Sequence, residues 1–181
     1  MKRLEARRCS LVLVDYQDRL MPAIHGGEAA VANALRLADA ARLLGVPVLG
    51  TEQNPGGLGP NVDAVRQRCA STLAKMHFDA CEDGLLGRLG ALGDVPDVVV
   101  AGCEAHVCLL QTALGLRRAG RDVWVVADAC GSRVPADHAL AMQRLRDAGA
   151  CIAGTEMVVF EWVHDCRHPA FRQVLALVKT R

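Results

Sequence analysis

The length of 181 residues suits one domain with a substantial core, and 51% of the residues are hydrophobic. The 21 basic and 20 acidic residues leave a net charge of +1, and only 3% of the residues are aromatic. The chain therefore lacks the basic stripe and the stacking surface that are typical of a nucleic-acid binder. This balance favours a small or neutral substrate. No apolar run is long enough to span a bilayer, and the apolar stretch after the basic start is too short for a signal peptide, so we expect no membrane partner.

Short apolar runs alternate with segments of helical periodicity along the chain. The runs predict six strands, at 11–15, 46–50, 72–75, 98–101, 123–127 and 151–153. The helical spacing predicts helices at 28–44, 61–69, 82–89, 107–119 and 135–148, with two more beginning near 156 and 169. We expect Asn61 to cap the second of these helices and the Pro- and Gly-rich segment 55–60 to be an irregular loop.

This alternation predicts an α/β fold: one three-layer domain over residues 1–181, with helices covering both faces of a six-stranded, mostly parallel sheet. Ligands of such sheets bind beyond the carboxyl ends of the strands, at the topological switch point. Asp15, Lys75 and Cys108 all fall at predicted strand ends or just after them. We therefore expect an acid, a base and a thiol to meet in one crevice, an arrangement typical of nucleophilic catalysis.

The chain has eight cysteines and no C-x-x-C pair. Several lie in apolar runs, where cysteine acts as a small hydrophobe, and a chain with this much core needs no disulfides. We expect reduced thiols and a cytoplasmic location. Cys108 differs because a helical pattern begins near it, and a helix N-terminus favours the reactive thiolate. The eight are Cys9, Cys69, Cys81, Cys103, Cys108, Cys130, Cys151 and Cys166.

Three motifs at the predicted strand ends resemble those of the isochorismatase-like cysteine hydrolases. They are Leu-Val-Leu-Val-Asp15-Tyr-Gln, Lys75 followed by Met-His-Phe-Asp, and Gly102-Cys-Glu-Ala-His-Val-Cys108. The resemblance covers nearly the whole chain, in the family's order and spacing. It implies the Rossmann-like fold of those hydrolases.

Further motifs are similar to one branch of that family, the isochorismatase domain-containing proteins. This branch is similar in Thr51-Glu52-Gln53 with the following Gly-Leu-Gly, and in His168-Pro169. The family also often has an Asp-Ala pair after the fifth strand, where this chain has Asp128-Ala129.

The resemblance implies a catalytic triad: Cys108 as nucleophile, Asp15 as the base that takes its proton, and Lys75 as the cation that stabilises the thiolate and orients the aspartate. A thiol with a pKa of roughly 8.5 needs such a partner to be mostly ionised near neutral pH. The N–H of Cys108 and a neighbouring N–H would form an oxyanion hole. The family's cis peptide bond would lie between Cys103 and Glu104.

We expect Gln53, His77 and Glu104 to contact the substrate. Read without the resemblance, each catalytic candidate has a structural alternative: Cys108 as a buried helix cysteine, Asp15 as a cap after the first strand, and Lys75 as a surface lysine. The presence of all three together favours the catalytic interpretation.

No metal or other cofactor is expected. The metal-dependent nicotinamidases of the superfamily carry Asp-x-His after the second strand, where this chain has Thr51-Glu52-Gln53, so nicotinamidase activity is not expected either. His164, Cys166 and His168 form a separate candidate metal cluster. On a helix Cys166 would point away from the two histidines, so a loop near a helix boundary is the preferred interpretation.

The expected function is hydrolysis of an amide-like or related C–N bond of a small molecule through a covalent thioester. The alternative is a catalytically idle scaffold that acts through self-assembly or a protein partner. A nucleotide-binding module is disfavoured because the glycine fingerprint is missing. The resemblance also implies a homo-oligomer.

Overall fold

The computed structural model describes residues 3–179, in which six strands form one wholly parallel sheet. The strand order is β3-β2-β1-β4-β5-β6. The predicted α/β fold is therefore confirmed. The strands are β1 (Cys9–Val14), β2 (Val48–Gln53), β3 (Ser71–Lys75), β4 (Asp97–Gly102), β5 (Asp122–Val126) and β6 (Cys151–Ala153).

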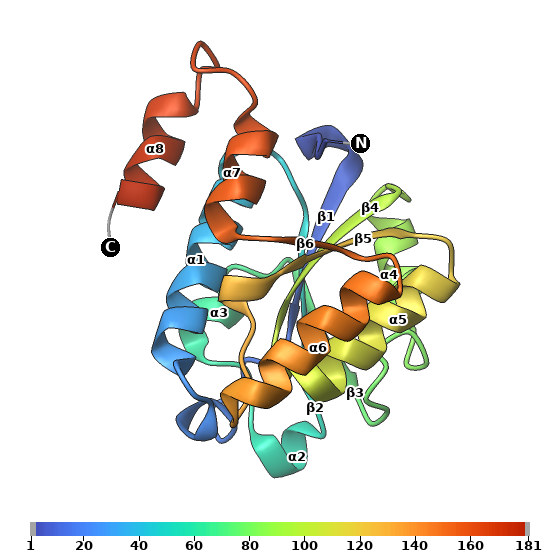
Figure 1. The fold of residues 1–181 in the computed structure, drawn as a ribbon. Helices are drawn as coiled ribbons and strands as arrows, with labels where there is room; N and C mark the ends of the chain where they lie inside the picture. Colours follow the sequence, from blue (N-terminus) through green and yellow to red (C-terminus); the bar gives the residue numbers. More distant parts are fainter. Residues whose placement is uncertain (1–2, 180–181) are drawn as a thin grey trace.

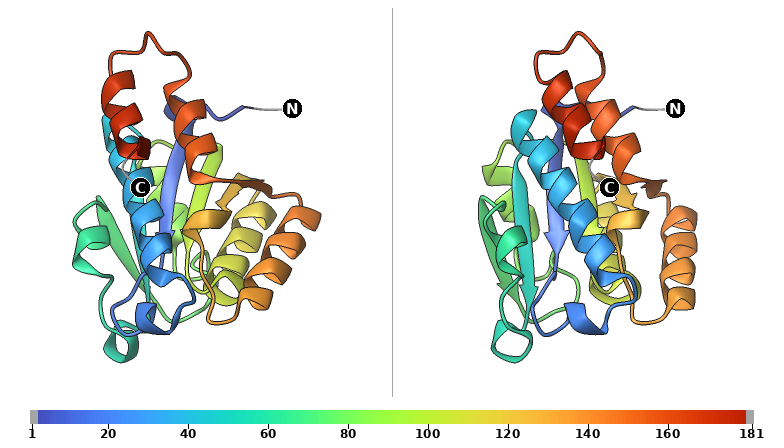
Figure 2. Two further views of the ribbon diagram at one scale, coloured as in Figure 1. Left: turned by 60° about the vertical axis from the view of Figure 1, so that its left-hand side comes forward. Right: turned by 90° about the vertical axis from the view of Figure 1, so that its left-hand side faces the viewer.

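Helices cover both faces of this sheet (Figures 1 and 2). On one face, α1 (Gly27–Leu43) packs against α7 (Thr155–Val163), α8 (Phe171–Lys179) and the single turn α3 (Asp63–Arg66). On the other face lie α4 (Leu85–Ala91), α5 (Leu110–Arg118) and α6 (Pro135–Asp147). Across residues 3–179, no helix combines the length and apolar character that crossing a bilayer requires.

Burial follows the position of each strand in the sheet. Every residue of β1 and β4 is buried, because these central strands are covered on both faces, which explains their apolar runs at 11–14 and 98–101. The edge strand β3 buries only Leu73 and Lys75. The buried face of β3 therefore ends in a lysine.

The topological switch point lies between β1 and β4. The chain goes from β1 to β2 on one side and returns through β4 on the other, so the residues after these two strands flank one crevice. Gly102 ends β4 with φ +151°, and a Cβ there would lie 2.1 Å from the carbonyl oxygen of Val14. Only glycine lets the two strand ends approach this closely.

Four local predictions need correction. Strand β2 continues to Gln53 instead of ending at Gly50, the expected loop at 55–60 contains the helical turn α2 (Pro55–Leu58), and the helix expected over 61–69 is only the turn α3. Asn61 is no cap, because its side chain donates to the Thr51 carbonyl at the end of β2. That bond holds Asn61 against the end of β2, and the helical turn α3 begins only at Asp63.

Candidate active site

Asp15 directly follows β1 and turns away from the strand direction with φ +53°. Its carboxylate is buried and has two polar neighbours. Thr51 Oγ1, on β2, donates to Oδ1 at 2.6 Å, and Lys75 Nζ forms an ion pair with Oδ2 at 2.8 Å. The Asp15 carboxylate is therefore held in one orientation by side chains of two other strands.

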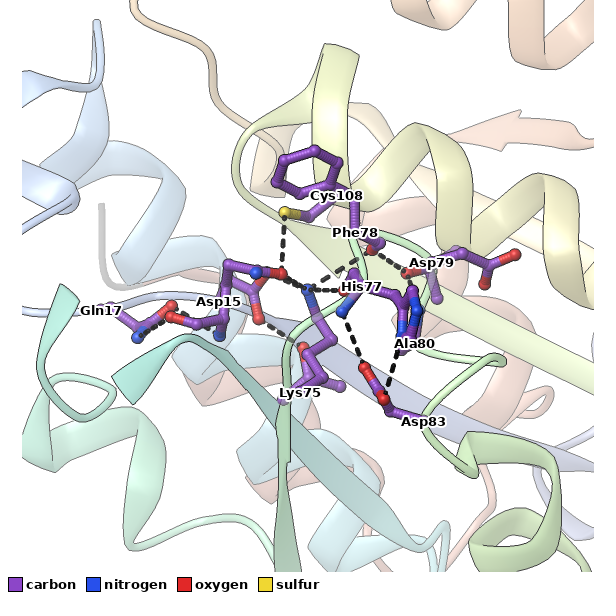
Figure 3. Close-up of polar contacts among 12 residues, drawn as sticks. Asp15, Gln17, Lys75, His77, Phe78, Asp79, Ala80, Asp83 and Cys108 are labelled. Atoms are coloured by element: carbon purple, nitrogen blue, oxygen red, sulfur yellow. Dashed lines mark hydrogen bonds and ion pairs between the residues drawn. The ribbon is translucent and has the colours of Figure 1, made fainter. Parts of the chain in front are cut away.

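Lys75 ends β3, two strands away from β1, and its long side chain spans the end of β2 to reach Asp15. Its ammonium donates to Gln53 Oε1 at 2.7 Å and to the carbonyls of His77 and Phe78, both at 3.4 Å. The surface-lysine alternative is wrong, since the side chain is fully buried. Dashed lines in Figure 3 mark contacts of this ammonium within the site.

Cys108 lies in a π-helical segment, Ala105–Leu109, which leads from β4 into α5. Such wide turns are frequent at functional sites. The thiol is 6% exposed and its Sγ is 3.9 Å from Gln53 Oε1, the same oxygen that Lys75 contacts (Figure 3). The structure thus brings Cys108, Asp15 and Lys75 together around Gln53.

The turn before Cys108 has the expected cis peptide bond between Cys103 and Glu104. The carbonyl of Glu104 accepts hydrogen bonds from the N–H groups of Val107 and Leu109, at 3.0 and 3.3 Å. These two residues flank Cys108. Its own N–H therefore lies within a turn that is organised around one carbonyl.

The protonation of Cys108 differs from the sequence expectation. Burial first, and then the neighbouring Asp15 charge, raise the pKa of this thiol to about 12, and Lys75 opposes the shift. The pKa values of Cys69, Cys81 and Cys130 are likewise raised by burial, to about 11, 12 and 12. Desolvation therefore works against the thiolate that the helix N-terminus and Lys75 were expected to favour.

The three residues expected to contact substrate occupy different places. Gln53 belongs to the site, where its side chain contacts Lys75 and Cys108. The imidazole of His77 is exposed and pairs with Asp83, which raises the histidine's pKa. The carboxylate of Glu104 accepts hydrogen bonds from Arg133 Nε, at 2.8 Å, and from the backbone N–H of Arg133. Substrate contact by these residues stays a prediction.

Two further residues belong to the site, and sequence reasoning missed the role of the first. Thr51 was interpreted only as a missing metal ligand, yet its hydroxyl orients Asp15. Phe78 is half-exposed, and in the view of Figure 3 its ring projects toward the thiol of Cys108. Thr51 lies close to Asp15 because β2 pairs with β1 and Thr51 is opposite Val14. This contact can be predicted only when the strand order is known.

The candidate cluster of His164, Cys166 and His168 lies in the loop between α7 and α8, as preferred from the sequence. His168 Nδ1 accepts a hydrogen bond from the Ala170 N–H, so this ring nitrogen already has a partner within the loop. Within the described part of the chain, no three His, Cys, Asp or Glu side chains are grouped as a metal site would require.

Comparison with known proteins places this site in a family. The family model described as the isochorismatase domain matches residues 9–157. The chain belongs to the isochorismatase family. Human isochorismatase domain-containing protein 2 is 37% identical over 169 residues, which cover 93% of this chain and 82% of that protein. The zebrafish protein of the same name is 35% identical, with 97% and 89% covered.

Solved structures agree with this assignment to the isochorismatase family. A Caenorhabditis elegans protein described as MAR1 ribonuclease has a TM-score of 0.92 and 32% identity, with 99% of this chain and 93% of that chain covered. Escherichia coli YcaC, described as an octameric hydrolase of unknown specificity, has a TM-score of 0.86 and 26% identity, with 99% and 98% covered. The family predicted from the strand-end motifs is confirmed.

Proposed function

We propose that this protein is a cysteine hydrolase that cleaves an amide-like or related C–N bond of a small molecule through a covalent thioester on Cys108. The observation that carries the proposal is the convergence of three residues from different strand ends. Lys75 and Cys108 both contact the Gln53 amide oxygen, and Asp15 forms a buried ion pair with Lys75. A structural role for the thiol alone would not require a buried acid and base beside it.

The geometry supports a two-step mechanism. The thiol rests protonated, so its proton moves to Asp15 as Sγ attacks the carbonyl carbon, and the oxyanion is stabilised by the Cys108 N–H. The C–N bond then breaks, and Asp15 returns the proton to the leaving amine. In the second step Asp15 takes a proton from water, which attacks the thioester and releases the acid and the thiol.

Lys75 and Thr51 orient the base in this mechanism. Thr51 and Lys75 contact different oxygens of the Asp15 carboxylate. Because both contacts are buried, the carboxylate cannot rotate away from the thiol without losing one of them. Lys75 also offsets the negative charge that develops on sulfur.

Relatives lend further support. A Pseudomonas aeruginosa YcaC structure, 25% identical with a TM-score of 0.86, is described with covalent acrylamide, which is an amide-bearing electrophile. The Caenorhabditis elegans relative is described as a ribonuclease, so RNA cleavage is the activity against which the amide assignment is best tested.

The test is a panel of small primary and N-substituted amides, read by release of ammonia or amine. We expect Cys108→Ser to abolish release. Cys130→Ser, which changes another buried thiol whose Sγ donates to the Val126 carbonyl, should retain it. Release that survives Cys108→Ser would contradict the proposal, and RNA cleavage that depends on Cys108 would replace it.

The proposed reaction needs no metal or cofactor, since Asp15 and Lys75 supply the base and the cation. Activity should survive dialysis against a chelator. Loss of activity that zinc or iron restores would overturn this part of the proposal.

We further infer a homo-oligomer in the cytoplasm, supported by the octameric Escherichia coli neighbour. Light scattering that gives the monomer mass at all concentrations would refute the oligomer. An idle scaffold remains the competing function, and it predicts an oligomer whose Cys108 has no amide turnover.

A further inference from the structure

The loop at 76–84, which follows the catalytic lysine, lies against the helix that follows the proposed nucleophile. Three residues of α5, spaced three apart along one helical face, contact this loop: Thr112, Gly115 and Arg118. Together they join the segment after β3 to the segment after β4. No step of the proposed reaction requires these contacts directly.

Thr112 joins the two segments by its hydroxyl, which is buried. The hydroxyl accepts from the Ala80 N–H at 3.1 Å and donates to the Phe78 carbonyl at 3.3 Å. The Phe78 carbonyl also accepts from Lys75 Nζ. One carbonyl of the loop is therefore shared between α5 and the catalytic lysine.

Asp79 is the second anchor, and its side chain is 3% exposed. One oxygen accepts from Arg118 Nη2 at 2.7 Å and the other from the Cys81 N–H at 2.9 Å. A Cβ at Gly115 would lie 2.3 Å from Asp79 Oδ2 and 2.4 Å from Oδ1. The glycine thus leaves a notch in α5 that the carboxylate fills.

Phe78 is the residue that these anchors place. It lies between Lys75 and Asp79 in the chain, its carbonyl is held by Thr112, and in the view of Figure 3 its ring projects toward the Cys108 thiol. Phe78 is 49% exposed, so one side of the residue is open to solvent.

We infer, on the basis of the proposed function, that Asp79 is a positioning residue: held in the Gly115 notch by Arg118, it fixes Phe78 as a specificity-determining side chain near Cys108 and the loop carbonyls around Lys75. The preferred substrates are then amides with an apolar, ring-bearing group beside the scissile bond. Offset or edge contact with an aromatic ring contributes up to about tenfold in affinity.

The test uses two thiol-directed amides, 2-chloroacetamide and N-benzyl-2-chloroacetamide, each corrected for its reaction rate with glutathione. The parent protein carries Cys151→Ser and Cys166→Ser, because these two thiols are exposed. Mass spectrometry gives kinact and KI, and peptide mapping confirms Cys108 as the site. We expect the benzyl reagent to have a KI about tenfold lower than that of the small reagent.

Three variants separate positioning from direct contact. Phe78→Ala should remove the benzyl preference and change kinact little. Asp79→Asn should remove the same preference and also lower kinact, because the loop carbonyls no longer hold Lys75. Gly115→Ala, which fills the notch, should behave like Asp79→Asn. Arg117→Gln is the matched control on α5, since Arg117 bonds the Arg121 carbonyl and not the loop.

The double variant shows whether Asp79 acts on KI through Phe78. In Phe78→Ala/Asp79→Asn, KI should equal that of Phe78→Ala alone, since Asp79 acts on KI only through the ring. Additive effects on KI, or an unchanged benzyl preference in folded Asp79→Asn, would overturn the inference. Cys108 labelling without any benzyl preference in the parent would also overturn it and leave the hydrolase proposal standing. A parent whose Cys108 resists both reagents would count against both proposals.

Discussion

Lys75 Nζ lies 2.8 Å from Asp15 Oδ2, and neither side chain is exposed to solvent. Burial deprives both charges of hydration, so each depends on the other and on a few fixed dipoles. Thr51 supplies one of these dipoles to the carboxylate, and Gln53 supplies one to the ammonium. The pair therefore contributes both to stability and to the proposed chemistry, and the two roles can be separated by mutation.

Lys75→Met keeps the approximate volume and removes the cation, leaving a buried carboxylate without its counter-charge. We expect the free energy of unfolding, measured by urea denaturation, to fall by about 3–5 kcal/mol. Asp15→Asn/Lys75→Met should regain much of this loss and still lack amide turnover. If the double variant is no more stable than the single one, the ion pair does not account for the loss.

Thr51→Val removes the hydroxyl that donates to Asp15 Oδ1 at 2.6 Å and keeps the shape of the side chain. A hydrogen bond to a charged group contributes about 1.5–3 kcal/mol, and we expect a loss of that size on urea denaturation. Turnover should fall by on the order of tenfold or more, because the base is less well oriented. Thr51→Ser retains the donor and should stay near the parent in both measurements. Equal losses in the two variants would show that the methyl group matters and the hydroxyl does not.

Sequence patterns predicted the sheet well because parallel strands covered on both faces need unbroken apolar runs, and β1 and β4 have them. They also predicted the meeting of Asp15, Lys75 and Cys108, since parallel strands end at one edge. Strand ends are thus visible in a sequence when each apolar run stops at a polar residue.

Contacts across the sheet were less predictable. The role of Thr51 depends on β2 lying beside β1, and the displacement of Asn61 from its expected cap depends on the same neighbour. The pKa of Cys108 depends on burial, which sequence spacing does not measure. The anchoring of Asp79 on Gly115 likewise joins two segments that only the fold brings together.

Gly102→Ala tests the close approach of β4 to β1. The added Cβ would lie 2.1 Å from the Val14 carbonyl oxygen and must displace backbone, so we expect a loss of several kcal/mol or failure to fold. Gly87→Ala is the matched control, because Gly87 lies within α4 with nothing within 4 Å of its added Cβ. It should stabilise the protein by about 0.5–1 kcal/mol. Circular dichroism during thermal unfolding compares the two, and similar melting temperatures would contradict the strand-end argument.

Asp15→Asn should separate thiol ionisation from catalysis. The Asp15 charge raises the pKa of Cys108, so removing it should lower that pKa from about 12. Amide turnover should fall, because the proton acceptor is lost. The rate of alkylation against pH, in the background lacking Cys151 and Cys166, gives the pKa. A Cys108 pKa in Asp15→Asn that equals or exceeds that of the parent would mean that the Asp15 charge does not act on the thiol as described.

The most direct test of the central claim is rapid acid quenching of the protein during turnover of an amide found in the panel, followed by mass spectrometry of the intact chain and its peptides. The mechanism predicts a mass increase equal to the acyl group, located on Cys108 and removed by neutral hydroxylamine, as a thioester would be. Asp15→Asn should form this adduct more slowly, and Cys108→Ser should not form it. Turnover with no acyl group on Cys108 under any quenching time, or an acyl group on another residue, would contradict the account.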